Sequence, residues 1–153
     1  MRERIQDCYA DFDVETGVLR VGNSRIEKVM RLHGSFFGTE KITDRFENEE
    51  WAGEALLWQR CPVLGAQEQP VSHFEAVVQD TPGVRPHLKT TLTLAGKNGT
   101  VWYEYRVFPE IPFVFSQIFA ERKGVLDIAQ IQNDSLHCTG VESQYVQSRN
   151  GQT

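Results

Sequence analysis

Several features that would assign a chain to a functional class are missing from this sequence of 153 residues. It holds no apolar run of the roughly 20 residues that a membrane-spanning helix needs. The opening residues MRERIQDCYADFDVE include basic side chains but no apolar stretch after them, so they lack the pattern of a signal peptide. The sequence therefore predicts a soluble protein without a membrane partner.

Cysteine and positive charge are also scarce. The three cysteines, Cys8, Cys61 and Cys138, are an odd number spread over the chain, which disfavours a disulfide framework and favours the cytoplasm. Lys and Arg together number 16 against 21 Asp and Glu, so the net charge is −5. Nucleic acids and anionic lipid surfaces select basic surfaces, so we expect neither as a partner.

What is present is the composition of one folded domain. The chain is 40% apolar and 24% charged, as ordinary globular proteins are, and its length fits a single domain over residues 1–153. Apolar and polar residues alternate with a period of two over much of it, which is typical of half-buried β-strands.

The strongest alternation lies in residues 88–122, which we expect to form three antiparallel strands. Asn98-Gly99 separates the first two strands and is suited to the positive φ angles of a tight hairpin. Residues 19–32 predict a further strand pair with its turn at Asn23-Ser24, and other strands are expected at 73–79, 125–131 and 140–147.

One segment breaks the strand pattern. Residues 47–60 place Trp51, Ala55 and Trp58 at helical spacing, but Gly53 interrupts them, and we expect an irregular connection with at most one helical turn. Short strands separated by frequent turns predict an all-β protein, either an antiparallel β-sandwich or a barrel.

Motifs that carry chemistry do not match. Gly22-Asn23-Ser24-Arg25-Ile26 has Ile26 where a nucleophile elbow requires glycine, so Ser24 is interpreted as a turn residue. No GxGxxG or phosphate-binding loop occurs, and the four histidines, His33, His73, His87 and His137, have no metal-ligand spacing. We therefore expect no catalytic residue, no metal site and no cofactor.

Acidic residues crowd the segment from Glu40 to Glu54. Catalytic carboxylate pairs usually come from separate elements, with one member buried to raise its pKa. Packed so closely in sequence, these acids are instead predicted to form a solvated acidic loop.

Aromatic residues are the remaining functional signal. Trp102 lies in a strand centre and is predicted to belong to the core. Trp51 and Trp58 lie in the irregular acidic connection, where a ring is harder to bury. Packing in the core is the commoner role for a tryptophan ring. The alternative is contact with carbohydrate or with another domain, and for this reason Trp51 and Trp58 are candidate site residues.

Two blocks of the chain carry a recognisable pattern of strands and turns. The first block is GVLRVGNSRIEKVMRLHGSFFGTEKITDRFENEEW, and the second is TVWYEYRVFPEIPFVFSQIFAER. The positions that carry the pattern are Leu19, Val21, Asn23, Ile26, Thr39, Ile42, Asp44 and Glu50-Trp51 in the first, and Phe108-Pro109 and Pro112 in the second. At these positions the chain resembles the N-terminal β-domain of glycoside hydrolases of the α-galactosidase clan.

The resemblance implies a β-supersandwich of the galactose mutarotase-like fold. In this clan the domain precedes a (β/α)₈ barrel that carries two catalytic aspartates. The β-domain packs on the barrel and can contribute loops to the rim of the sugar pocket. On this basis the chain is expected to be the non-catalytic N-terminal part of a longer glycoside hydrolase, with carbohydrate and the catalytic barrel as partners.

This hypothesis predicts an exposed apolar, aromatic patch of several hundred Å². The first alternative is a free-standing β-barrel that binds a small ligand. The second is a complete enzyme that combines His73 or His137 with a distant carboxylate, and the third is a purely structural domain.

Overall fold

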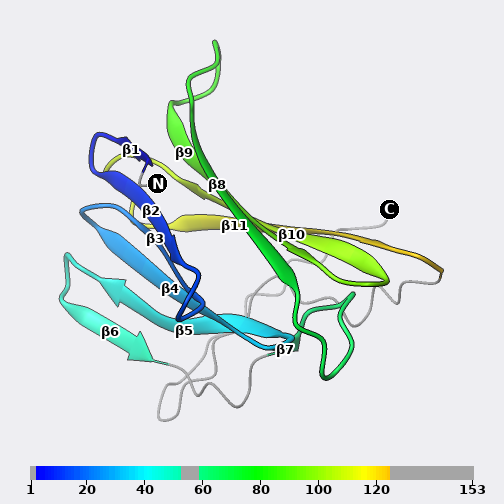
Figure 1. The fold of residues 1–153 in the computed structure, drawn as a ribbon. Coiled ribbons are helices and arrows are strands. Elements are labelled where there is room, and N and C mark those ends of the chain that lie inside the picture. The colour runs from blue at the N-terminus through cyan, green and yellow to red at the C-terminus, as the bar shows by residue number, and fades with distance from the viewer. Residues whose placement is uncertain (1–2, 53–58, 125–153) are drawn as a thin grey trace, which may run out of the picture.

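The computed structural model describes residues 3–52 and 59–124, which fold into two antiparallel sheets packed face to face (Figure 1). The seven-stranded sheet consists of β1 (Glu3–Ile5), β2 (Cys8–Asp13), β3 (Val18–Gly22), β4 (Ile26–His33), β5 (Phe36–Asp44), β6 (Glu49–Ala52) and β7 (Gln59–Arg60). The four-stranded sheet consists of β8 (Val71–Gln79), β9 (His87–Ala95), β10 (Gly99–Val107) and β11 (Val114–Arg122).

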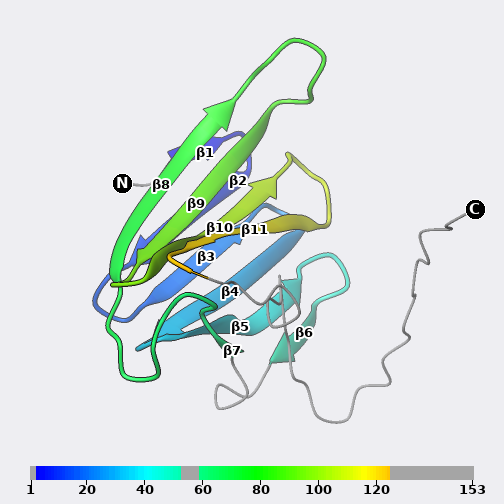
Figure 2. The same cartoon turned by 90° about the vertical axis from the view of Figure 1, so that its right-hand side faces the viewer.

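Both sheets are built mainly by pairing neighbours along the chain. Strands β1 to β6 lie in sequence order, and β7 pairs with the N-terminal end of β5. The second sheet has the order β11-β10-β9-β8 and lies over the first (Figure 2). The predicted all-β antiparallel sandwich is therefore confirmed, and the described strands form two separate sheets instead of the closed ring of a barrel.

The alternation in the sequence places the core between the sheets. On β9, Leu88, Leu92 and Leu94 are fully buried, while Lys89 and Thr91 are half-buried on the other face. The core joins both sheets through their inward side chains, namely Cys8, Ala10, Leu19, Val21, Met30, Phe37, Cys61, Val63, Leu64, Leu88, Leu92, Leu94, Val101, Tyr103, Tyr105 and Val107.

The predicted strand pairs are confirmed. Residues 88–122 form β9, β10 and β11 in continuous register, β8 covers the strand expected at 73–79, and β3 and β4 enclose the turn at Asn23-Ser24. The strands expected at 125–131 and 140–147 lie outside the described residues.

Glycine is needed at position 99 for a different reason than the sequence suggested. Positive φ angles among the described residues do not include Asn98 or Gly99. Gly99 instead pairs with Arg122 on β11, where an added Cβ would lie 2.1 Å from the carbonyl oxygen of Glu121. Glycine is required here because two strands approach closely, not because a tight turn needs an unusual φ.

The predicted acidic loop is wrong. Glu40 and Asp44 lie on β5, and Glu49 and Glu50 lie on β6, so the acids belong to a hairpin. Arg31 on β4 pairs with Glu40, and Lys41 on β5 pairs with Glu50, so two of the acids are paired across strands. Residues 53–58, including Gly53 and Glu54, lie outside the described part of the chain.

Candidate functional site

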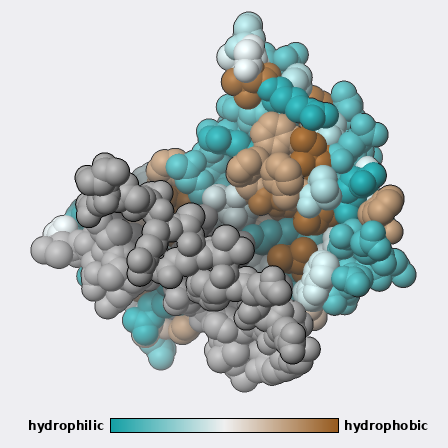
Figure 3. Space-filling model, turned by 180° about the vertical axis from the view of Figure 1, so that it is seen from behind, coloured by the Kyte–Doolittle hydropathy of each residue, from teal (hydrophilic) through white to brown (hydrophobic). Residues whose placement is uncertain are grey.

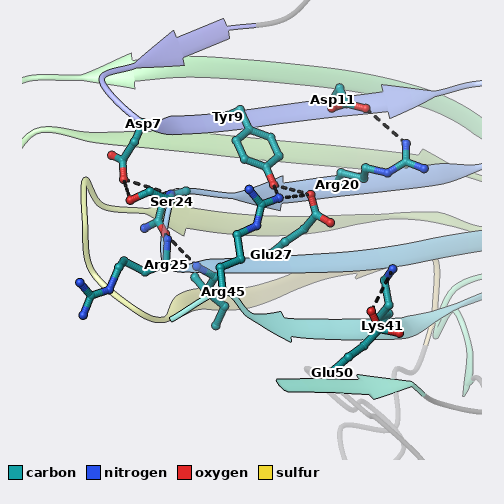
Figure 4. A network of polar contacts seen from close by, with 12 residues as sticks. Asp7, Tyr9, Asp11, Arg20, Ser24, Arg25, Glu27, Lys41, Arg45 and Glu50 are labelled. Atoms are coloured by element: carbon teal, nitrogen blue, oxygen red, sulfur yellow. Dashed lines mark hydrogen bonds and ion pairs between the residues drawn. The ribbon is translucent and has the colours of Figure 1, made fainter. Parts of the chain in front are cut away.

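The two outward faces of the sandwich differ in character. The outer face of the seven-stranded sheet carries cross-strand ion pairs, several of which are drawn in Figure 4. The pairs between strands are Asp11–Arg20 at 3.7 Å, Arg31–Glu40 at 3.1 Å and Lys41–Glu50 at 3.5 Å, and Glu27 pairs at 2.9 Å with Arg45 in the turn after β5. Charges paired in this way are typical of a surface that faces water.

The outer face of the four-stranded sheet exposes large aromatic side chains instead. Phe113, Phe115 and Phe119 are 45%, 54% and 45% exposed. Seen from behind, the molecule carries a patch of apolar side chains among hydrophilic ones (Figure 3). Three rings of about 200 Å² that are each about half exposed leave about 300 Å² of aromatic surface open in total.

Three of the rings on this face contact one another and form what we call the phenylalanine cluster, Phe108, Phe113 and Phe115. Phe115 meets Phe113 edge-on with centroids 5.0 Å apart, and meets Phe108 edge-on at 5.8 Å. The imidazole of His87 lies 4.8 Å from the ring of Phe108 and is itself buried. Its Nδ1 bonds to the carbonyl oxygen of Arg85 at 3.0 Å, which fixes the ring that supports the cluster.

Asn23 fixes the loop that carries the cluster. Its side chain is fully buried, and Nδ2 donates to the carbonyl oxygens of Phe108 at 2.8 Å and Ile111 at 2.7 Å. Its Oδ1 accepts from the backbone N–H groups of Arg25 at 2.8 Å and Ile26 at 3.0 Å. One side chain therefore joins the β3–β4 turn of one sheet to the β10–β11 loop of the other.

Asp7 makes a second link between the same loops. Its carboxylate accepts from the hydroxyl of Ser24 at 2.6 Å, drawn in Figure 4, and from the backbone N–H of Glu110 at 3.2 Å. Glu110 has a φ of 58°, a left-handed conformation that this bond helps to hold. Burial acts to raise the pKa of Asp7, but the hydrogen bonds from Ser24 and Glu110 outweigh it and lower the pKa.

Beside the cluster lies a charged group at the middle of the face. Glu104 on β10 has a side chain only 8% exposed, and it pairs with Arg106 at 2.6 Å and with Lys89 on β9 at 3.1 Å. Gln117 lies directly opposite Glu104 on β11 and is exposed. An open depression of about 250 Å³ is lined by Glu104, Arg106, Phe115, Ser116 and Gln117, and we call it the polar depression.

The two described tryptophans, Trp51 and Trp102, lie on strands in places that the sequence pattern did not assign to them. Trp102 is half-buried on the outer face, opposite Phe119, so its predicted place in the core is wrong: the core side of β10 is formed by Val101 and Tyr103. Trp51 is half-buried on β6, opposite Ile42, in a different sheet from the phenylalanine cluster. Trp58 lies outside the described residues, so its predicted contact is untested.

The exposed phenylalanines were missed as site residues, although the sequence carries their signal. The three exposed phenylalanines lie at odd-numbered positions and therefore on one side of an extended segment. Val114 and Ile118 lie at even-numbered positions and pack on the core. A strand that is apolar on both faces at a sheet surface indicates a covered outer face.

The environments of Cys8, Cys61 and Ser24 do not favour nucleophilic chemistry at these side chains. Burial raises the pKa of Cys8 to about 12 and that of Cys61 to about 11, which suppresses the nucleophilic thiolate. Ser24 serves the turn, as predicted, by donating to Asp7. Among residues 3–52 and 59–124 no group of three or more His, Cys, Asp or Glu side chains is placed to hold a metal ion.

Comparisons of the chain with protein-family models, curated proteins and solved structures found no match, so the family resemblance stays a prediction. In the described part of the chain no helix is long and apolar enough to span a membrane.

Proposed function

We propose that this chain is a non-catalytic β-sandwich domain that docks on a neighbouring protein domain through the outer face of its four-stranded sheet. The family resemblance suggests which domain that is: the catalytic barrel of an α-galactosidase-like glycoside hydrolase, with carbohydrate bound nearby. The observation that carries the proposal is the exposure of three phenylalanines, Phe113, Phe115 and Phe119, on this face of the sandwich.

Magnitudes support a role for the three exposed phenylalanines, Phe113, Phe115 and Phe119, as the centre of an interface. Covering about 300 Å² of apolar surface is worth about 7 kcal/mol at 25 cal/mol per Å². This is comparable with the cost of about 4–15 kcal/mol for bringing two free proteins together. These rings alone would therefore give weak association between separate chains, and a covalent link to the partner domain would make their contribution sufficient.

Preorganisation also favours docking. Asn23 and Asp7 already hold the loop that carries Phe108 and Phe113, so little conformational entropy is lost when a partner covers the rings. Both described thiols, Cys8 and Cys61, are buried and free, which supports a cytoplasmic location for the domain.

The test begins with the open reading frame in which this chain is encoded. If a barrel is encoded in that frame, it is produced as a separate chain and its binding to residues 1–153 is measured by titration calorimetry. Phe113→Ser should weaken binding at least tenfold, because a central aromatic anchor is lost. Phe46→Ser is the matched control, since Phe46 is 67% exposed beside the seven-stranded sheet. A frame without a barrel, or equal effects of the two substitutions, would refute the proposal.

A further inference from the structure

We infer that the polar depression, lined by Glu104, Arg106, Phe115, Ser116 and Gln117, binds the pyranose ring of a sugar. The inference rests on the proposed function, because it locates the carbohydrate contact of that domain on the docking face. It assigns the two halves of the face to different partners: the phenylalanine cluster to protein and the adjoining depression to sugar.

The charged centre of the face is unsuited to a dry protein interface. Interface cores are depleted of charged residues, yet Glu104, Lys89 and Arg106 lie together beside the exposed rings. Lys89 and Arg106 keep 30% and 42% of their side chains in contact with water. Covering them with apolar side chains would remove that water without replacing its hydrogen bonds, which is unfavourable. A ligand rich in hydroxyl groups would replace them.

The cross-strand register places aromatic rings on both sides of the polar groups. Phe115 lies opposite Arg106, Gln117 opposite Glu104, and Phe119 opposite Trp102. Successive pairs on one face are two residues apart, about 7 Å along the strands. A planar amide and a carboxylate therefore lie between two aromatic surfaces, with the guanidinium of Arg106 on the side of Phe115.

This arrangement matches the two chemical sides of a pyranose. The C–H face of the sugar is apolar and stacks on an aromatic ring, and its rim carries hydroxyls that both donate and accept. Glu104 accepts hydrogen bonds, Arg106 donates them, and the amide of Gln117 does both. The side chain of Arg106 is 42% exposed, so its guanidinium can donate to a ligand oxygen as well as to Glu104.

The size of the depression limits the ligand. Pockets for drug-sized molecules measure about 300–1,000 Å³, and this depression is about 250 Å³ and open to one side. It therefore fits one sugar ring, and a longer chain would continue over the exposed ring of Phe119.

The experiment titrates the whole chain, residues 1–153, with galactose, glucose and mannose and follows backbone amide shifts by NMR. We expect saturable shifts at Gln117 and Phe115 with at least one sugar. Gln117→Ala should weaken binding at least tenfold, because it removes an exposed side chain without disturbing the core. Gln67→Ala, also exposed, is the matched control and should bind as the unmodified chain does.

Separate titrations with the barrel and with the sugars distinguish this inference from the proposed function, because either ligand can bind while the other does not. Glu104→Gln keeps the shape of the side chain, removes its charge and should weaken sugar binding, with a thermal melt as the check on folding. Absence of binding for all three sugars, or equal affinity of Gln117→Ala and the unmodified chain, would overturn the inference even if docking is observed.

Discussion

Replacing Asn23 by alanine is expected to lower the free energy of unfolding by about 2–4 kcal/mol, because a fully buried side chain that makes four hydrogen bonds is lost. The substitution leaves two backbone N–H groups of the β3–β4 turn without their acceptor. It also leaves the carbonyl oxygens of Phe108 and Ile111 without their donor. Four hydrogen bonds counted independently would give a larger loss of unfolding free energy. The expected loss is smaller because water can reach part of this site once the side chain is removed.

Urea denaturation followed by far-UV circular dichroism measures the effect. With an m-value of about 2 kcal/mol per M, the midpoint should fall by about 1–2 M. Asn23→Asp separates the two halves of the site: it keeps the acceptor for Arg25 and Ile26 but places a carboxylate oxygen against two carbonyl oxygens. We expect it to be at least as destabilising as alanine.

Ser24→Ala is the control for this prediction. It removes an exposed hydrogen bond to Asp7 in the same turn and should cost less than about 1 kcal/mol. If Asn23→Ala and Ser24→Ala were equally mild, the view that Asn23 fastens the β10–β11 loop to the other sheet would be wrong.

Three further outcomes follow from the side-chain environments. The lowered pKa of Asp7 adds stability that is present above its unfolded pKa of about 3.9 and is lost as the pH falls through the folded pKa. The urea midpoint should therefore fall between pH 6 and pH 2, and it should fall by less in Asp7→Asn than in the unmodified chain. Cys8 and Cys61, with pKa values of about 12 and about 11, should resist iodoacetamide in the native state and react in urea, as peptide mass spectrometry would show. Glu104→Ala should lower the free energy of unfolding by about 1–3 kcal/mol, because two cations lose their partner. Glu40 is more exposed than Glu104, so Glu40→Ala should lower it by less than about 1 kcal/mol in the same urea assay.

Local patterns predict the sheets well where one face is apolar and the other polar. The three strands from His87 to Arg122 alternate cleanly, and their order follows from short connections between neighbours. The hairpin of β5 and β6 was not predicted, because its ion pairs join residues on different strands: Glu40 with Arg31 on β4, and Glu50 with Lys41 on β5. In the sequence, Lys41 and Glu50 lie within an acidic run, and only the structure shows that they form an ion pair across two strands.

The candidate site depends on contacts that are distant in sequence. Asn23 was correctly interpreted as a turn residue, but its bonds to Phe108 and Ile111 cross 85 and 88 positions of the chain. Nothing in a local pattern indicates such a link. Trp102 was assigned to the core because strand centres are usually buried, and only the register with Phe119 places it on the outer face.

The central claim is that the outer face of the four-stranded sheet is covered by another domain in the whole protein. Hydroxyl-radical footprinting tests it directly by comparing phenylalanine oxidation in residues 1–153 alone and in the product of the complete reading frame. The account predicts that Phe113 and Phe115 are oxidised in the chain alone and protected in the complete product, while Phe46 is oxidised equally in both. Equal oxidation of Phe113 and Phe115 in the two samples would contradict it.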